Sequence, residues 1–261
     1  MHLKMISCSN ISVKIGDKTL IEDINCDIAR GDYLCIVGPN GSGKSTFLKT
    51  LFALLPASGG TISIDGHTLS HYSQKKLAQL ISYVPQTGGS HLSFNVEEFV
   101  RMARYSYHHV FSEWQSQDQD AVENALTITD SQPFRFRKMS TLSGGECQRV
   151  MIAAALAQDT PVLMLDEPTA FLDPHHQVAV HQLIRKLNQQ LHKTIIEVTH
   201  DINHAAQHSK HVLALLDGKC LWHGPAEQFL DAERLQQLYQ QAFVFAKHPH
   251  HNRLIAVADE S

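Results

Sequence analysis

The sequence lacks any apolar stretch long enough to cross a membrane. Its longest apolar runs, such as 33–37 and 162–165, are strand-sized, whereas a membrane helix needs roughly 20 residues. The first residues, Met1 to Met5, lack the apolar core and small-residue cleavage site of a signal peptide. We therefore expect the chain to stay in the cytosol, with no transmembrane segment of its own.

Blocks of like charge are missing as well. The sequence has 22 Lys and Arg against 26 Asp and Glu, which gives a formal net charge of −4. It contains no basic run of the kind that nucleic-acid arms and polybasic membrane anchors use. We therefore expect no nucleic acid among the partners.

Cysteine is scarce, and the spacing of the cysteines indicates no pairs. The five cysteines are odd in number, scattered, and without a C-x-x-C pair. This favours reduced thiols in core or neutral positions over a disulfide framework or a zinc ribbon. The sequence also lacks internal repeats and low-complexity tracts. With 261 residues, of which 43% are hydrophobic, it can bury a full core as one large domain or two small ones.

What the sequence does contain is a strand-rich start followed by alternating strands and helices. Alternating apolar residues at 11–15 and 24–28, around a Gly16-Asp17 turn, predict an antiparallel β layer. The short apolar runs 33–37, 162–165 and 195–198 are typical of buried parallel strands. The predicted fold class is therefore α/β, a mostly parallel sheet with helices plus an N-terminal antiparallel β layer.

Two stretches are predicted to be helical. Apolar residues at 48, 51, 52 and 55 share one helix face, and Pro56 is expected to end that helix. Residues 95–158 carry no strand pattern but have helix starts at Asn95 and Ser143. We interpret this stretch as an inserted α-helical subdomain.

The most specific motif is a glycine-rich loop. It matches the pattern G-x-x-x-x-G-K-[ST] between a predicted buried strand and an amphipathic helix, and reads Gly38-Pro39-Asn40-Gly41-Ser42-Gly43-Lys44-Ser45-Thr46. The glycines let backbone N–H groups point at phosphate oxygens, and the helix dipole adds to that field. Lys44 supplies a positive charge, and Ser45 offers a hydroxyl to Mg²⁺. The alternative is a chance glycine-rich turn, which the strand-to-helix context disfavours.

Two adjacent acids follow another apolar run. Asp166 and Glu167 come at the end of the predicted strand 162–165, where open α/β sheets place their ligand crevice. Asp166 suits contact with Mg²⁺, directly or through water, and Glu167 suits polarisation of the water that attacks the γ-phosphate. Taken alone, the pair could equally be a solvated turn, but the phosphate loop favours the catalytic interpretation.

A third motif indicates which family of phosphate-loop proteins the sequence resembles. Leu142-Ser143-Gly144-Gly145-Glu146 lies about twenty residues before Asp166, and it resembles the signature motif of ABC transporter ATPases, whose fifth residue is usually Gln and commonly Glu. Ser143 and the amides of Gly144 and Gly145 are expected to cap a helix and form an anion site. The resemblance implies that this site closes on ATP held by a second copy, giving a head-to-tail, two-fold dimer.

Other positions match the same family in order and spacing. Gln86 resembles the Q-loop glutamine that contacts Mg²⁺ and the attacking water, and Asp173 the D-loop residue that crosses the dimer interface. His200 resembles the switch histidine that contacts the γ-phosphate. Ile15 stands where the family usually stacks an aromatic residue on adenine, so selectivity for ATP over GTP is expected to be weak.

The resemblance covers residues 1 to 240 and implies one ABC ATPase domain with ATP and Mg²⁺ as cofactors. The nucleotide-binding core is expected at 1–94 and 159–240, with the helical subdomain at 95–158 carrying the signature. Residues 241–261 form a short C-terminal extension, with a hairpin expected over 243–257 about residues 250–253.

Within the family, the sequence most resembles the bacterial ATPases that energise import of ferric siderophores, haem and cobalamin. The similar segments are Leu77-Ala78 through Ile81 to Pro85-Gln86, Phe171-Leu172-Asp173 with His176-Gln177, and His200-Asp201-Ile202-Asn203. This implies a subunit on the cytoplasmic face of the inner membrane, bound to permease subunits and indirectly to a substrate-binding protein. The alternatives are an ATPase for free zinc or manganese, and a soluble ABC ATPase of the repair or translation type.

Histidine is unusually frequent, with 18 residues. His200, His204, His208 and His211 have helical spacing, and such pairs can bind zinc or copper. The favoured interpretation keeps His200 for ATP and places the others on a solvated helix face. His248, His250 and His251 are interpreted as part of a turn rather than a ligand set.

Overall fold

The computed structural model describes residues 4–86, 93–108, 113–247 and 253–260. The chain divides into two compact units. Unit 1 comprises Met1–His71 and Ile196–Ser261, and unit 2 comprises Tyr72–Ile195. Among the described residues, none of the helices combines the length and apolar character needed to span a bilayer. The boundaries expected at residues 94, 158 and 240 stay predictions.

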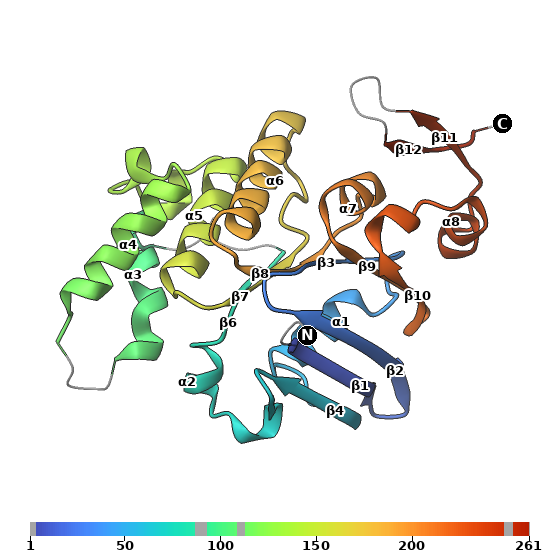
Figure 1. Cartoon of the computed structure of the whole chain (residues 1–261). Coiled ribbons are helices and arrows are strands. Elements are labelled where there is room, and N and C mark those ends of the chain that lie inside the picture. The colour runs from blue at the N-terminus through green and yellow to red at the C-terminus, as the bar shows by residue number, and fades with distance from the viewer. Residues whose placement is uncertain (1–3, 87–92, 109–112, 248–252, 261) are drawn as a thin grey trace. The chain divides into compact units, whose positions relative to one another are not determined.

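Unit 1 begins with the antiparallel layer that the alternating pattern predicts (Figure 1). Its strands, in the order β2-β1-β4-β5, are β1 (Lys4–Ile15), β2 (Lys18–Ala29), β4 (Gly59–Ile64) and β5 (His67–Thr68). The β1–β2 turn is the expected Gly16-Asp17, and Gly16 takes a φ of 57°, as tight two-residue hairpin turns require. Ile11 and Val13 are buried, whereas Ile15 is 58% exposed.

A second set of strands in unit 1 leads to the phosphate loop. Its order is β10-β9-β3-β8, with β3 (Tyr33–Val37), β8 (Thr194–Val198), β9 (His211–Leu216) and β10 (Lys219–Pro225). The unit boundary falls inside β8. Strands β3 and β9 are parallel, and all five residues of β3 are buried. This confirms the buried parallel strand predicted at 33–37.

The helices of unit 1 are short. They are α1 (Lys44–Leu51), α7 (Ile202–His208), α8 (Ala232–Tyr239) and the 3-10 turns η1 (Leu69–His71) and η5 (Ala226–Gln228). Leu48 and Leu51 are buried as predicted, but α1 ends before Leu55. The cause is Ala53, whose φ of 54° turns the backbone out of the helical path.

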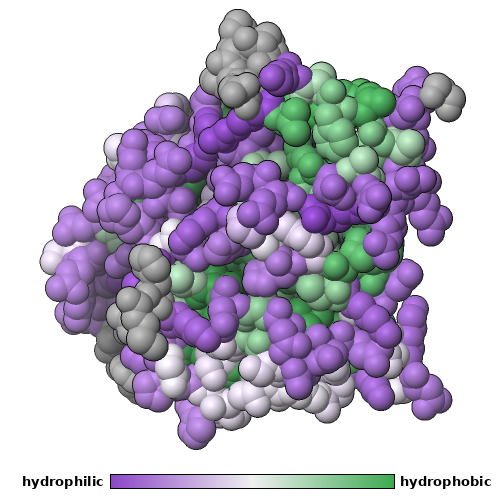
Figure 2. Space-filling view, turned by 45° about the vertical axis from the view of Figure 1, so that its right-hand side comes forward, coloured by the Kyte–Doolittle hydropathy of each residue, from purple (hydrophilic) through white to green (hydrophobic). Residues whose placement is uncertain are grey.

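The C-terminal hairpin is also present. Strand β11 (Phe243–Lys247) pairs antiparallel with β12 (Leu254–Ala258), while the turn expected at His250 to Asn252 lies outside the described residues. Figure 2 shows hydrophobic residues gathered in patches between hydrophilic ones on the visible face. Val244 and Val257 lie opposite each other in the hairpin and are about half exposed.

Unit 2 pairs two parallel strands and gathers most of the helices (Figure 1). The strands are β6 (Ile81–Val84) and β7 (Val162–Asp166). The helices are α2 (Gln74–Leu77), α3 (Val96–Met102), η2 (Ala103–Tyr107), α4 (Ser116–Ile128), η3 (Gln132–Phe134), η4 (Met139–Thr141), α5 (Gly144–Ala157) and α6 (Pro174–Gln189). The regular elements in the described part of 95–158 are therefore all helices, as predicted, joined by turns, with one isolated bridge between Asn95 and Lys138.

The inserted helices share a core of their own. Val96 and Val100 of α3, Val122 and Leu126 of α4, and Val150 of α5 are fully buried in one cluster. Asn95 and Ser143 each begin a helix with a complete capping box, which satisfies orphan N–H groups at both helix starts. These starts are the two that the sequence predicts.

Candidate nucleotide-binding site

The phosphate loop runs from the end of β3 into α1 and has glycine where nothing larger fits. Gly38 has a φ of 145°, and a Cβ there would lie 2.1 Å from the carbonyl oxygen of Leu215. Gly43 has a φ of 97°, and a Cβ there would lie 2.5 Å from Cγ2 of Ile21. The loop is thus packed tightly against β9 on one side and β2 on the other.

Lys44 lies inside this loop. Its side chain is 5% exposed, and Nζ donates to the carbonyl oxygens of Gly38 and Pro39 at 2.9 Å each. Oγ of Ser42 is buried and has no hydrogen-bond partner among the described residues. Because α1 begins at Lys44, its first amides add positive potential at the same place. The loop therefore has the donors and the charge to hold phosphate groups.

The other loop residues that are expected to bind the nucleotide lie on both sides of Lys44. Ser45 and Thr46 are half-buried in the first turn of α1, and Asn40 and Gly41 are exposed. Ile15 lies at the end of β1, paired with Lys18 across the hairpin. Its proposed contact with adenine stays a prediction.

His200 lies beside the strand that feeds the loop. It is exposed and follows β8, where the amide of Thr199 donates to the carbonyl oxygen of Ile36 in β3 at 3.1 Å. The amide of Asp201 donates to Oγ1 of Thr199 at 3.1 Å. The backbone on both sides of His200 is thus hydrogen-bonded within unit 1.

In unit 2, the ends of two neighbouring strands bring together the acids and the Q-loop glutamine. Val84 of β6 is in register with Leu165 of β7, so the residues that follow each strand are neighbours. Nε2 of Gln86 donates to Oε2 of Glu167 at 2.6 Å. Glu167 has a φ of 50°, a left-handed conformation that costs energy in a non-glycine residue and is often found at functional sites.

Asp166 is held by a residue that sequence reasoning missed. It is 3% exposed, and its Oδ2 accepts a hydrogen bond from the hydroxyl of Tyr83 at 3.2 Å. Burial, with Asp166 close by, raises the pKa of Tyr83 above its usual value, so the hydroxyl stays protonated and can donate. The signal was a tyrosine within an apolar strand three residues before Gln86.

The signature motif begins helix α5 with a reciprocal cap. Oγ of Ser143 accepts from the amide of Glu146 at 3.3 Å, and Oε2 of Glu146 accepts from the amide of Ser143 at 2.8 Å. Nη1 of Arg137 donates to the other oxygen of Glu146 at 3.1 Å. The Ser143 amide, together with Arg137, lowers the pKa of Glu146. Glutamate at this position therefore caps the helix as an anion.

The signature helix α5 packs directly on His176 of α6. A Cβ at Gly145 would lie 2.0 Å from Cδ2 of His176. Asp173 caps α6, since its Oδ1 accepts from the His176 amide at 2.9 Å and its Oδ2 lies 2.7 Å from Nδ1 of the same residue. Asp173 is thus joined through His176 to Gly145, a link that the sequence did not indicate.

One sequence interpretation is wrong. The four histidines with helical spacing, at 200, 204, 208 and 211, do not share a helix, because α7 spans only Ile202–His208. His200 precedes it, and His211 begins β9. His204 is 4% exposed and therefore does not lie on a solvated face. It faces inward to Tyr33 and Glu197.

The candidate residues thus form two groups. The phosphate loop, Ile15 and His200 belong to unit 1, and Gln86, Asp166, Glu167, the signature motif and Asp173 belong to unit 2. A glycine-rich loop between a buried strand and a helix, together with acids at a strand end, defines a phosphate-loop nucleoside triphosphatase.

Comparison with known proteins shows which family of phosphate-loop proteins the chain belongs to. Residues 21–170 match the family model described as "ABC transporter". This is more than half of the sequence, and the chain belongs to that family. It is an ABC-type ATPase subunit, as the signature motif predicted.

Curated relatives resemble the chain over most of its length. The ferric enterobactin transport ATP-binding protein of Escherichia coli (strain K12) is 34% identical over 229 residues, which is 88% of this chain and 84% of the relative. The petrobactin import ATP-binding protein FpuC of Bacillus anthracis is 37% identical over 235 residues, covering 90% and 86%. A hemin import ATP-binding protein of Streptomyces coelicolor (strain ATCC BAA-471 / A3(2) / M145) is 34% identical over 257 residues, covering 98% and 91%.

Solved structures of ABC transporters have the same fold as this chain. A chain of a metal-chelate type ABC transporter in an inward-facing conformation is 27% identical, with a TM-score of 0.86 over 98% of this chain and 97% of that one. A bacterial ABC transporter cassette solved as a dimer is 29% identical, with a TM-score of 0.75 over 85% and 99%. The predicted phosphate-loop fold is therefore confirmed.

Proposed function

We propose that this chain hydrolyses ATP to drive import of a ferric siderophore, haem or a cobalamin-type substrate. The observation that carries the proposal is the similarity over about nine-tenths of the chain to ATP-binding proteins named for enterobactin, petrobactin and hemin. The metal-chelate type transporter supports the same class of cargo.

The chain works with partners in this proposal. It docks on permease subunits at the cytoplasmic face of the inner membrane and acts indirectly with a substrate-binding protein. A second copy of the chain completes the ATP sites, in line with the dimeric cassette. The exposed Ser143 and Gly144, with the Gly145 amide, then face ATP bound to the opposite copy. Asp173 lies at the dimer interface.

ATP is held mainly by unit 1. The backbone N–H groups of residues 38–46 other than Pro39, together with the ammonium of Lys44, bind the phosphates, and the buried hydroxyl of Ser42 supplies a further donor. The hydroxyl of Ser45, the amide oxygen of Gln86 and the carboxylate of Asp166 are the oxygen ligands that Mg²⁺ prefers. Bound there, Mg²⁺ would neutralise charge between the outer phosphates.

Hydrolysis needs a group that polarises water. Glu167 has this role, because its carboxylate is half-buried, anchored by Gln86 at 2.6 Å, and placed by its left-handed backbone at the end of β7. His200 donates to the γ-phosphate and stabilises the charge that develops as the bond to it breaks.

The cargo is tested by reconstitution. The chain, co-purified with its permease and placed in vesicles with ATP, should drive uptake of a ferric siderophore or haem presented by the binding protein. The same vesicles should leave free Zn²⁺ and Mn²⁺ outside. ATP-dependent uptake of either free cation, with none of the chelates, would contradict the proposal.

A further inference from the structure

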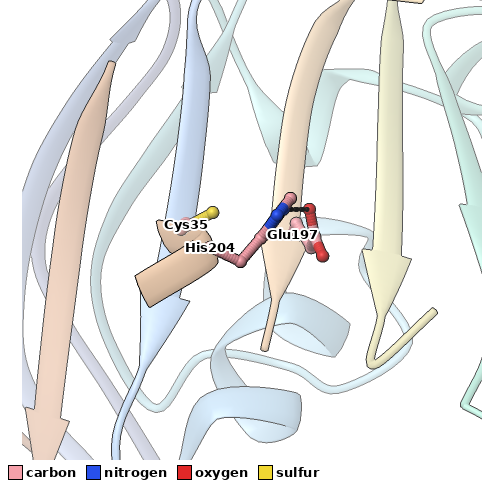
Figure 3. Close-up of side chains that lie close together, drawn as sticks. All are labelled: Cys35, Glu197 and His204. Carbon is pink, nitrogen blue, oxygen red and sulfur yellow. Dashed lines mark hydrogen bonds and ion pairs between the residues drawn. The ribbon is translucent and has the colours of Figure 1, made fainter. Parts of the chain in front are cut away.

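Unit 1 contains a buried group of polar side chains next to His200. Glu197 of β8 is 0% exposed, Tyr33 of β3 is 2% exposed, and His204 of α7 is 4% exposed. The hydroxyl of Tyr33 donates to Oε2 of Glu197 and lies 3.1 Å from Nε2 of His204. The same nitrogen lies 3.4 Å from Oε2 of Glu197, and Figure 3 shows the two side chains facing each other.

This arrangement joins three elements through one carboxylate. A carboxylate with no exposure to water is costly unless hydrogen bonds and opposite charge surround it. Burial, with Glu197 beside it, raises the pKa of Tyr33, so the phenol remains a hydrogen-bond donor. These buried side chains hold strands β3 and β8 and helix α7 together. If one of the three elements moved, the polar groups would lose hydrogen bonds that water could not replace.

The tied positions lie on both sides of His200. Glu197 precedes it by three residues, and His204 follows it by four. The amide of His204 also donates to Oδ1 of Asp201 at 2.8 Å. The short segment that carries His200 is thus anchored at both ends to Tyr33, the first residue of the strand that feeds the phosphate loop.

The same side chains could in principle bind a metal ion. Ligand atoms of Cys35, Glu197 and His204 all lie within 4.8 Å of one another, and Figure 3 shows Cys35 beside the pair. However, burial raises the pKa of the Cys35 thiol, and a metal ligand must be a thiolate. The Tyr33 hydroxyl already bonds to the oxygen and the nitrogen that an ion would need. The geometry favours a hydrogen-bonded network.

We propose that Tyr33, Glu197 and His204 are positioning residues that hold His200 where it can reach the γ-phosphate. The proposal rests on the hydrolytic role proposed above for His200. None of the three touches the nucleotide in this account, since all are buried beneath the segment they anchor.

The test begins with Tyr33→Phe, which removes only the hydroxyl. We expect kcat for ATP to fall about tenfold while KM changes less than about twofold, because the phosphate loop is untouched. Glu197→Gln is the second variant and should have the same pattern. Cys35→Ala is the matched control, equally buried on the same strand, and should keep kcat within about twofold. All rates are measured well below each variant's unfolding temperature.

Two further measurements separate positioning from general stability. In a His200→Ala background, adding Tyr33→Phe should leave the residual kcat unchanged, because the residue being positioned is gone. In spectra of histidine-labelled protein, the His200 ring resonance, identified by its absence in His200→Ala, should shift in Tyr33→Phe and stay in place in Cys35→Ala.

Three results would overturn the proposal. One is an unchanged kcat together with an unchanged His200 resonance in both Tyr33→Phe and Glu197→Gln. Another is an equal fractional loss of kcat with and without His200, which would mean a purely structural role. The third is a metal ion that co-purifies at one per chain and is lost in Cys35→Ala. Wild-type turnover in His200→Ala would instead refute the role of His200, and the resonance would still report on positioning.

Discussion

The contact between Gly145 and His176 predicts the effect of a single added methyl group. In Gly145→Ala, the new Cβ would lie 2.0 Å from Cδ2 and 2.5 Å from Cγ of the His176 ring. The ring therefore has to move, and in doing so it gives up the 2.7 Å contact between its Nδ1 and Oδ2 of Asp173.

The size of the effect follows from opposing terms. Overpacking of this kind costs about 1–3 kcal/mol, and loss of the contact between His176 and the exposed Asp173 adds little, because water screens it. Alanine favours a helix over glycine by about 1 kcal/mol at most, and less at the second position of α5. We expect Gly145→Ala to lower the free energy of unfolding by about 1–2 kcal/mol.

Denaturant unfolding of four proteins tests this reasoning. They are the wild type, Gly145→Ala, His176→Ala and the double variant, because truncating His176 makes room for the new methyl group. Most of the loss caused by Gly145→Ala should vanish when His176 is already alanine. An equal loss in both backgrounds would show that the histidine ring is not the obstacle, and the packing argument would fail.

Three other substitutions test the nucleotide site. Glu167→Gln should keep ATP binding but lower turnover about 10²- to 10⁴-fold, because an amide cannot polarise water as a carboxylate does; wild-type turnover would remove Glu167 from its role. Ile15→Tyr should tighten ATP binding by about 1 kcal/mol, the low end for stacking on a base; equilibrium binding that is unchanged or weaker would place Ile15 away from adenine. Gly43→Ala should abolish ATP binding in the same assay, because its φ of 97° and the 2.5 Å approach to Ile21 leave no room for Cβ; retained affinity would contradict the close packing of the loop.

Much of the fold could be predicted because its signals are local. The five buried residues of β3 are adjacent in sequence, and the capping boxes at Asn95 and Ser143 are each complete within four residues. The end of α1 was misjudged because it depends on the backbone of Ala53, whereas the apolar pattern continues to Leu55.

The misjudged and missed residues have partners that are distant in sequence. His204 meets Tyr33 across 171 positions, so helical spacing alone could not reveal that it is buried. Glu197 lies in an otherwise apolar run, and nothing in that run indicates that Glu197 has buried polar partners. Tyr83 meets Asp166 only because β6 and β7 are parallel and in register. Such pairs can be recognised only in the tertiary structure.

In the proposed dimer, the phosphate loop of one copy works with the signature motif of the other. Ser143→Arg places a bulky side chain beside the exposed start of α5, so closure should fail while ATP still binds. Lys44→Ala removes the ammonium from the phosphate loop. Each variant alone should have almost no ATPase activity.

Mixing the two variants is the most direct measurement. A mixed dimer has one composite site with the intact phosphate loop of the Ser143→Arg copy and the intact signature motif of the Lys44→Ala copy. We expect ATPase activity to return in the mixture, clearly above either variant alone. If mixed dimers are demonstrated and no activity returns, the two motifs do not work in trans.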